Sequence, residues 1–254
     1  MGWMDSNKLM LNSDKTEILT MGTASGINQV DIDTIQILDS SISFQKSIKY
    51  LGVRLDPTLT MRDHISDVCR STYLSLRRIG SIRHLLTDKA AICLVNALIT
   101  SRLDFCNSTL AGINVDQVHR LQRLQNAATR LVTKKRKHDH ISPVLFDLHW
   151  LPVSYRIKFK LCVLVYRHFE ETLPPYLSSV LKTYHPQRSL RSSTDRLLVI
   201  PRVNLKSAGE RSFRYAASVE WNSLPKPLRF TPTLAQFKKN LKTHFFHQAF
   251  PECN

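Results

Sequence analysis

The stretch His119–Lys137, HRLQRLQNAATRLVTKKRK, decides the fold of the middle of the chain. Apolar residues recur in it, and just before it, at every third or fourth position, which is the spacing of one face of an α-helix. These apolar positions are Val118, Leu121, Leu124, Ala128 and Leu131. Asn114 stands where a helix N-cap is expected, and Gln117 has the spacing of a capping box. The stretch therefore predicts an amphipathic helix.

The same stretch is strongly basic, with seven Lys or Arg residues and no acid. Most of these cations form a second stripe beside the apolar one, with Ala127 as its only uncharged step. A face of this kind repels itself unless an anion lies against it, and a polyphosphate backbone is the commonest such anion. The seven residues that we predict to contact phosphates are Arg120, Arg123, Arg130, Lys134, Lys135, Arg136 and Lys137. Taken alone, the stretch also fits a solvated helix face.

The charge of the whole chain is large and unevenly distributed. Lys and Arg number 36 against 20 Asp and Glu, which gives a net charge of +16. Residues 1–60 carry a net charge of −2 and residues 61–254 carry +18. This asymmetry predicts a C-terminal portion that binds RNA, an RNA–DNA hybrid or DNA. A membrane surface would attract the same charge, but no Trp-, Phe- or Leu-rich face opposes the basic one, so we expect no membrane partner.

The cysteines and the absence of long apolar runs indicate the cellular compartment in which we expect the protein. The five cysteines are odd in number and widely spaced, and neither a CxxC motif nor a zinc-ligand spacing occurs. We expect reduced, mostly buried thiols and no metal site. No signal peptide and no apolar run near 18 residues is present, so we expect an intracellular protein, nuclear or cytoplasmic. The tetrad Lys134–Lys137 also fits a nuclear-localisation signal.

The pattern of apolar residues predicts an α+β fold in three parts. Residues 1–60 hold short β-leaning runs at 16–21, 34–38, 42–44 and 48–55, which predict a small antiparallel β region. Residues 61–137 predict a helical bundle that includes the basic helix, and residues 138–254 predict a mostly helical, proline-rich region. The helices that we expect outside the basic stretch cover 61–80, 87–110, 153–169, 208–221 and 234–246.

Five phrases, in this order along nearly the whole chain, carry a resemblance to a known family. They are Trp3 followed by LNSDKTE at 11–17, YLGV at 50–53, LQRLQNAA at 121–128, LHWLP at 148–152 and WNSLP at 221–225. The chain resembles the C-terminal third of LINE-type (non-LTR, jockey-like) retrotransposon reverse transcriptases. The resemblance implies that residues 1–60 are the end of a polymerase palm and that residues 61–137 are a thumb, which clasps the template–primer duplex.

The resemblance also assigns roles to short motifs. It implies a palm-end motif at Asn12, Lys15 and Thr16. It implies a primer-grip-like hairpin at Tyr50, Leu51, Gly52 and Val53. Members of the family polymerise with two Mg²⁺ ions held by palm carboxylates, one of them in a Phe/Tyr-Ala-Asp-Asp turn. This chain does not contain that turn. We therefore expect no enzyme and no cofactor in this chain on its own, because Mg²⁺ would belong to the missing catalytic centre.

Other groups of polar residues do not assemble into a catalytic pattern. We interpret Asp31 and Asp33 as solvated acidic residues of a turn, because no third residue that could bind a metal ion accompanies them. His138–His140 directly follows four cations, which would repel a metal ion, and His244 and His247 lack a third ligand. No GxSxG nucleophile signature occurs. We therefore name no catalytic and no metal-binding residue.

The sequence thus favours a transposon-derived, non-catalytic fragment that binds RNA or DNA without strong sequence preference. One alternative is an RNA-directed DNA polymerase that is active only when an upstream palm and fingers complete it. A second alternative is a protein-interaction scaffold, and a third is a translated remnant without a selected function. The sequence leaves the oligomeric state open.

Overall fold

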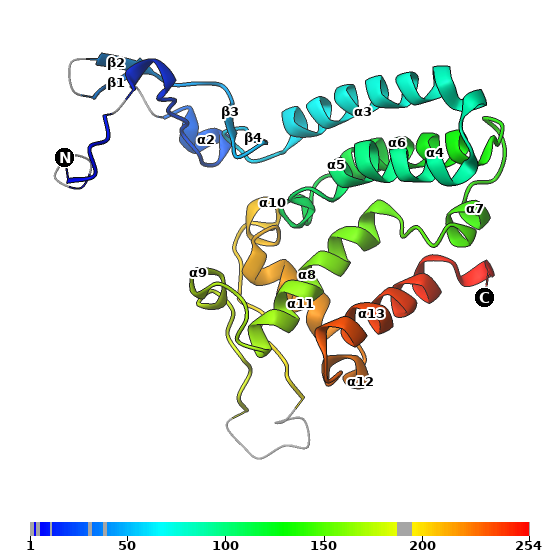
Figure 1. The fold of residues 1–254 in the computed structure, drawn as a ribbon. Coiled ribbons are helices and arrows are strands. Elements are labelled where there is room, and N and C mark those ends of the chain that lie inside the picture. The colour runs from blue at the N-terminus through cyan, green and yellow to red at the C-terminus, as the bar shows by residue number, and fades with distance from the viewer. Residues whose placement is uncertain are drawn as a thin grey trace. The chain divides into compact units, whose positions relative to one another are not determined.

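The computed structural model describes residue 3 and residues 6–10, 12–29, 32–37, 40–186 and 195–253. The chain forms two compact units, Met1–Ser66 and Asp67–Asn254, and the division falls within one long helix. The short antiparallel strands lie in the first part of the chain, and the longer helices follow them (Figure 1). This confirms the α+β prediction in its coarse form. No helix among the described residues is both long enough and apolar enough to span a bilayer.

The first unit contains two β-hairpins. Strands β1 (Thr34–Ile37) and β2 (Ser40–Ser43) pair antiparallel, with Ile35 opposite Ile42. Strands β3 (Ile48–Tyr50) and β4 (Val53–Leu55) form the second hairpin. Its turn places Leu51 at φ 46° and Gly52 at φ 87°, and two consecutive positive φ angles are what a two-residue hairpin turn requires. A short helix, α2, covers Ala24–Ile27.

The strand that we predicted at residues 16–21 does not form. Within it only Ile18 makes a β-bridge, to Phe44. The Gln45 N–H donates to the Ile18 carbonyl over 2.8 Å, but β2 has already ended at Ser43, so the bridge does not extend into a ladder. The expected run from Ile48 to Leu55 folds as the hairpin β3–β4 and not as one strand. The sequence from Met4 to Leu11 predicts the last turns of a helix, but Met4, Asp5 and Leu11 lie outside the described residues.

Helix α3 (Arg62–Ile82) follows a loop that the Asp56 carboxylate organises. Asp56 accepts hydrogen bonds from the Thr60 N–H over 2.7 Å and from the Met61 N–H over 2.8 Å. It also accepts from the hydroxyls of Thr58 and Thr60. Leu59 and Met61 adopt positive φ in this loop, so the carboxylate holds a backbone that two L-residues adopt only at a cost. The loop thereby sets where α3 begins.

The second unit begins with helices around α6 (Val115–Thr133). Helix α4 (Asp88–Val95) continues through a π-helical segment, Asn96–Thr100, into α5 (Ser101–Asp104). α6 packs against α4 and the π-helical segment. The part of α3 from Asp67 onward also lies along α6, because Gly80 approaches Leu131 and Arg83 reaches the carbonyls of Leu131 and Val132.

The helix predicted at 87–110 is shorter than expected and buries a different face. It ends at Asp104, because Phe105 is extended and Cys106 is left-handed at φ 49°. We expected Ala90, Leu94, Ala97 and Leu98 to face inward. The residues that the structure buries are Ala91, Val95, Ile99 and Leu103. The segment is apolar on several sides, so its periodicity does not determine one face.

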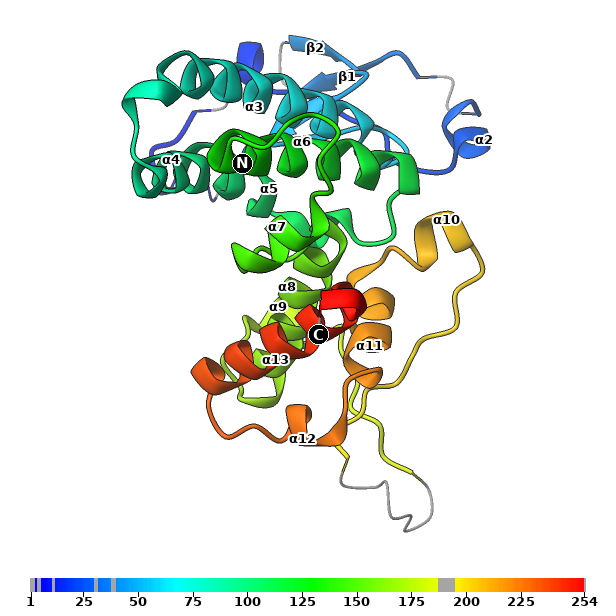
Figure 2. The ribbon, with the colours of Figure 1, turned by 90° about the vertical axis from the view of Figure 1, so that its right-hand side faces the viewer.

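The remaining helices form a group around α8 (Val153–Phe169), whose bounds match the prediction. α8 contacts α6, α11 (Phe213–Asn222) and α13 (Leu234–Ala249) (Figure 2). Aromatic rings fill the space between them: Tyr166 stacks on Phe237 with ring centroids 4.4 Å apart, and Trp221 is fully buried. The shorter helices are α7 (Ser142–Asp147), α9 (Pro175–Ser178), α10 (Lys206–Gly209) and α12 (Lys226–Arg229).

Several smaller predictions for this unit can be compared with the structure. The helix expected at 208–221 is divided into α10 and α11. The helix expected at 234–246 forms, with Thr233 as its N-cap, and extends to Ala249. The expectation of mostly buried cysteines is only partly met, because Cys69 and Cys162 are buried whereas Cys93 and Cys106 are exposed.

Candidate nucleic-acid interface

Helix α6 forms where the sequence predicts it, and Asn114 caps it. The Asn114 Oδ1 accepts a hydrogen bond from the Asp116 N–H over 2.8 Å. The predicted capping box does not form, since the Gln117 side chain instead accepts a hydrogen bond from the Arg120 guanidinium over 2.9 Å. Gln117 thus helps to orient one of the predicted phosphate contacts.

The buried side of α6 is broader than the predicted stripe. Leu121, Leu124 and Ala128 are buried as expected, but Val118 and Leu131 are only half-buried. Val132, Gln125 and Thr129 are buried in addition. The reason is that neighbouring helices cover α6 on several sides, and the Gln125 amide donates a hydrogen bond to the Leu151 carbonyl beside α8. A single-face pattern cannot predict polar residues that are buried by a second neighbour.

The outer face of α6 carries Arg123, which is exposed, beside His119 and Asn126. A shallow groove of about 550 Å³ runs along this face. Its lining residues are Asp116, His119, Arg120, Gln122, Arg123 and Asn126. Arginine, histidine and amide side chains on one open groove can donate several hydrogen bonds to phosphate oxygens.

The positive charge of this face extends toward α3. Burial raises the pKa of the Cys69 thiol, while the nearby Arg120 and Arg123 guanidinium groups partly oppose that rise. Both arginines therefore act on the same point of α3.

Arg130 has a different role from the one that the stripe predicts. Its guanidinium donates from Nε to the Arg136 carbonyl over 3.2 Å and from Nη2 to the Asp139 carbonyl over 3.4 Å. The side chain is half-buried. Arg130 thus holds the segment that follows the helix, so its positive charge lies at the base of that segment and not on an open helix face.

The helix ends at Thr133, and the basic stripe does not continue to Lys137 as we predicted. Lys134 is the C-cap in a left-handed conformation, φ 56°, and its N–H bonds the Arg130 carbonyl. The Asp139 carboxylate closes the following turn by accepting the Arg136 N–H over 2.7 Å. Four consecutive cations disfavour another helical turn, because like charges one turn apart repel. The four exposed cations on this basic loop are Lys134, Lys135, Arg136 and Lys137.

Carboxylates do not neutralise these cations. Among the described residues, neither Arg123 nor Arg130 nor any residue of the basic loop forms an ion pair with an acidic side chain. Lys134 acts on Asp88 only at longer range: the pKa of Asp88 is lowered chiefly by the hydrogen bond from Arg83, with a smaller contribution from Lys134. The positive charge of Arg123 and of the basic loop is therefore available to an external anion.

Sequence reasoning missed the outer face of α3. Tyr73, which we expected to face inward, is 50% exposed. From Asp67 onward, the exposed arginines of this helix are Arg70, Arg77 and Arg78. Their spacing of seven and eight residues places them on one side of a helix, which is the signal that could have identified them. Arginines beside an exposed ring are a common arrangement in proteins that bind single strands.

The motifs assigned by resemblance lie in the first unit. Tyr50 is 62% exposed and Leu51 79% exposed at the tip of the β3–β4 hairpin, whereas Val53 is buried. The Asn12 side chain accepts a hydrogen bond from the Lys15 N–H over 3.2 Å, and the Thr16 hydroxyl bonds the Asn12 carbonyl. These bonds make a local turn. No side-chain group of three His, Cys, Asp or Glu within the described ranges is placed to hold a metal ion.

Comparisons of this chain with protein-family models, with curated proteins and with solved structures found no match.

Proposed function

We propose that this chain binds RNA, RNA–DNA hybrid or DNA through the phosphate backbone, without a catalytic step of its own. The proposal includes descent from the palm end and thumb of a LINE-type reverse transcriptase, as the five sequence phrases imply. The observation that carries the binding proposal is the exposed Arg123 on α6 together with the basic loop 134–137 at the end of the same helix, with no acidic side chain paired to either in the described part of the chain.

The structure supports the proposal through the way in which the basic loop is held. Arg130 anchors the loop from below, and Asp139 closes its turn through a backbone N–H. The Asp139 carboxylate therefore accepts its hydrogen bond from the main chain, and the four loop side chains remain exposed to solvent. A preorganised group of cations loses less conformational entropy when it meets a phosphate backbone than a mobile tail does.

The chemistry of the surface predicts low sequence specificity. Phosphate contacts carry no information about the bases, so binding through Lys and Arg positions a strand without reading it. Each phosphate that is neutralised releases counterions, so affinity falls as salt rises. Five contacts predict a slope of log affinity against log salt of about −3 to −5.

The direct test is fluorescence anisotropy with labelled single-stranded RNA, an RNA–DNA hybrid and duplex DNA of unrelated sequences, over a series of salt concentrations. The proposal predicts binding that changes little with sequence and has the slope given above. Retention of protein partners after nuclease treatment, with no measurable nucleic-acid binding, would support the scaffold alternative instead. Metal-dependent nucleotide addition by the purified chain would contradict the non-catalytic part of the proposal.

A further inference from the structure

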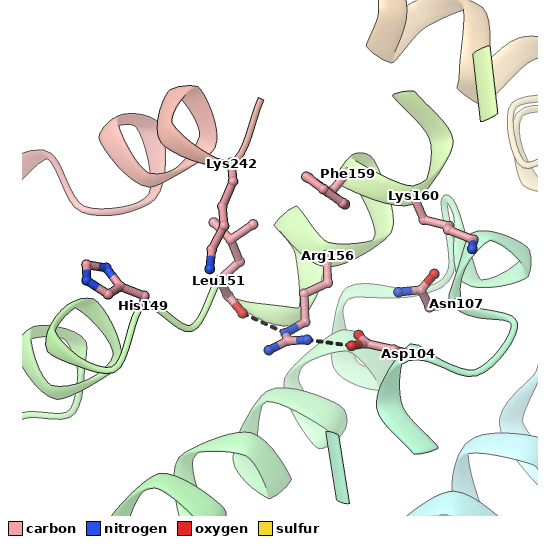
Figure 3. A pocket seen from close by; sticks show the side chains of 8 residues that line it. All are labelled: Asp104, Asn107, His149, Leu151, Arg156, Phe159, Lys160 and Lys242. Carbon is pink, nitrogen blue, oxygen red and sulfur yellow. Dashed lines mark hydrogen bonds and ion pairs between the residues drawn. The ribbon is translucent and has the colours of Figure 1, made fainter. Parts of the chain in front are cut away.

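A cavity of about 310 Å³ lies within the second unit, between α8, α13 and the segment that follows α5 (Figure 3). Its volume is at the lower end of the range for small-molecule sites. The side chains that determine its chemistry are Asp104, Asn107, Arg156, Phe159, Lys160 and Lys242. Basic groups from two helices therefore meet in one partly enclosed pocket, whose lining residues differ from those of the groove on α6.

Arg156 is fixed at the floor of the cavity by two hydrogen bonds. Its Nε donates to the Leu151 carbonyl over 2.9 Å, and its Nη1 pairs with the Asp104 carboxylate over 2.6 Å. Its Nη2 has no hydrogen-bond partner within the described part of the chain. A guanidinium that is held rigidly by two of its nitrogens, with the third left open, is preorganised for an incoming anion.

Lys242 faces Arg156 from the opposite wall. Figure 3 shows its side chain extending from α13 toward the Arg156 guanidinium. Partial burial and then the positive charge of Arg156 lower the pKa of Lys242. Lys242 forms no ion pair with an acidic side chain of the described residues. Two cations thus share a partly enclosed space in which only Asp104 offsets them.

The third wall combines a cation with an unsatisfied amide. Lys160 extends from α8 toward Asn107 (Figure 3). Asn107 is only 4% exposed, and its buried Oδ1 has no hydrogen-bond partner in the described structure. An orphaned buried acceptor costs about 1–3 kcal/mol, and the Oδ1 is covered by neighbouring atoms and not open to the cavity. Beside these polar groups, Phe159 contributes an apolar ring to the lining.

We propose that this cavity binds a phosphate monoester of an organic group, such as a nucleoside monophosphate. Arg156 and Lys242 would hold the phosphate, and Phe159 would contact the organic part. Arg156, Lys160 and Lys242 against Asp104 leave two positive charges, which match a monoester that approaches two negative charges at neutral pH. A phosphodiester carries one charge and fits less well.

This inference does not depend on the proposed nucleic-acid interface, since it uses none of the residues of the outer α6 face or the basic loop. The two proposals can therefore fail separately. The monoester could come from a free nucleotide or from the 5′-phosphorylated end of a strand, and the chemistry of recognition is the same for both.

The test is isothermal titration calorimetry of the full chain with adenosine 5′-monophosphate, adenosine and cyclic adenosine 3′,5′-monophosphate. We expect the monophosphate to bind at least about ten-fold more tightly than the other two, because each charge-assisted hydrogen bond lost weakens binding about ten-fold to hundred-fold. Lys242→Met should weaken binding by the same factor. Lys239→Met on the exposed side of α13 is the matched control and should change nothing.

Competition identifies the source of the ligand. Displacement of the monophosphate by a 5′-phosphorylated oligonucleotide, but not by the same oligonucleotide with a 5′-hydroxyl, assigns the site to strand ends. If neither oligonucleotide displaces the monophosphate, the site is assigned to free nucleotides. The proposal is overturned if the monophosphate does not bind at millimolar concentration, if the cyclic diester binds equally well, or if Lys239→Met weakens binding as much as Lys242→Met.

Discussion

The Nη2 of Arg83 donates a hydrogen bond to the Val132 carbonyl over 2.7 Å, although the two residues are 49 positions apart in the sequence. The same guanidinium donates from Nε to the Leu131 carbonyl over 2.9 Å and also pairs with Asp88. One buried side chain therefore ties the turn after α3 to the C-terminal end of α6. Because the basic loop begins two residues later, Arg83 fixes the place from which the loop departs.

Replacing Arg83 with Met should destabilise the second unit by about 2–4 kcal/mol, because carbonyls of the last turn of α6 would remain buried without a donor. Urea unfolding followed by circular dichroism measures the loss. Arg78→Met is the matched control, since Arg78 is exposed on α3, just before the turn that carries Arg83, and it should change the free energy of unfolding by less than about 0.5 kcal/mol. Equal effects of the two variants would show that Arg83 is not a structural anchor.

Asp56 should make stability depend on pH. Burial alone would raise its pKa, but hydrogen bonds from Thr58, Thr60 and Met61 outweigh burial and lower the pKa below its usual value of 3.8. A depressed folded-state pKa means that the carboxylate contributes stability above the unfolded-state pKa and loses it as pH falls through the folded-state value.

Asp56→Asn should therefore cost about 2 kcal/mol near pH 7, because amide replacement weakens the bonds to the Thr60 and Met61 N–H groups. The difference from the unaltered chain should shrink as pH falls below about 3.8. Urea titrations of both proteins between pH 7 and pH 2.5 test this. A difference that stays constant over that range would contradict the assigned hydrogen bonds.

The cysteines should differ in reactivity toward an alkylating agent. Burial, followed by the negative charge of Glu220, raises the pKa of the Cys162 thiol far above its usual value, so the reactive thiolate is scarce and inaccessible. Cys93 and Cys106 are exposed. Treatment of the native protein with iodoacetamide at pH 8, followed by mass spectrometry, should find both of these modified and Cys162 unmodified. Modification of Cys162 at a similar rate would mean that α8 is not packed as described.

Gly112 should resist substitution. It adopts φ +63°, and a Cβ built there would lie 2.8 Å from the Arg211 Cγ. Gly112→Ala should therefore destabilise the chain by about 1–2 kcal/mol through backbone strain and this close contact. Gly80→Ala is a useful comparison, because its Cβ would be at an ordinary 3.6 Å from Leu131. Thermal unfolding of the two variants should show a clearly larger loss for Gly112.

Helices with one apolar face and clear end signals could be predicted from the sequence. α8 starts directly after Pro152, and α13 has Thr233 as its cap, so both formed where we expected them. The β1–β2 hairpin followed from alternating isoleucines around a short turn. In each case the local pattern and the tertiary packing favour the same structure.

Other features depend on contacts that the sequence does not show. The end of α6 at Thr133 results from the left-handed Lys134 and from Asp139, which offers the Arg136 N–H an acceptor outside the helix. The inward face of α4 was predicted incorrectly because apolar residues surround that segment. The cavity at Arg156 joins residues from three separate parts of the chain, so no spacing of residues could have indicated it.

The central claim is that cations on the outer face of α6 and on the basic loop neutralise nucleic-acid phosphates. The most direct test measures the salt dependence of RNA binding for Arg123→Glu/Lys135→Glu against Lys238→Glu/Lys239→Glu, which makes the same charge change on exposed residues of α13. The account predicts that the first pair reduces the magnitude of the slope by about 2, one for each lost phosphate contact, and that the second pair leaves it unchanged. A slope that is unaltered by the first pair, or altered equally by both, would contradict the claim.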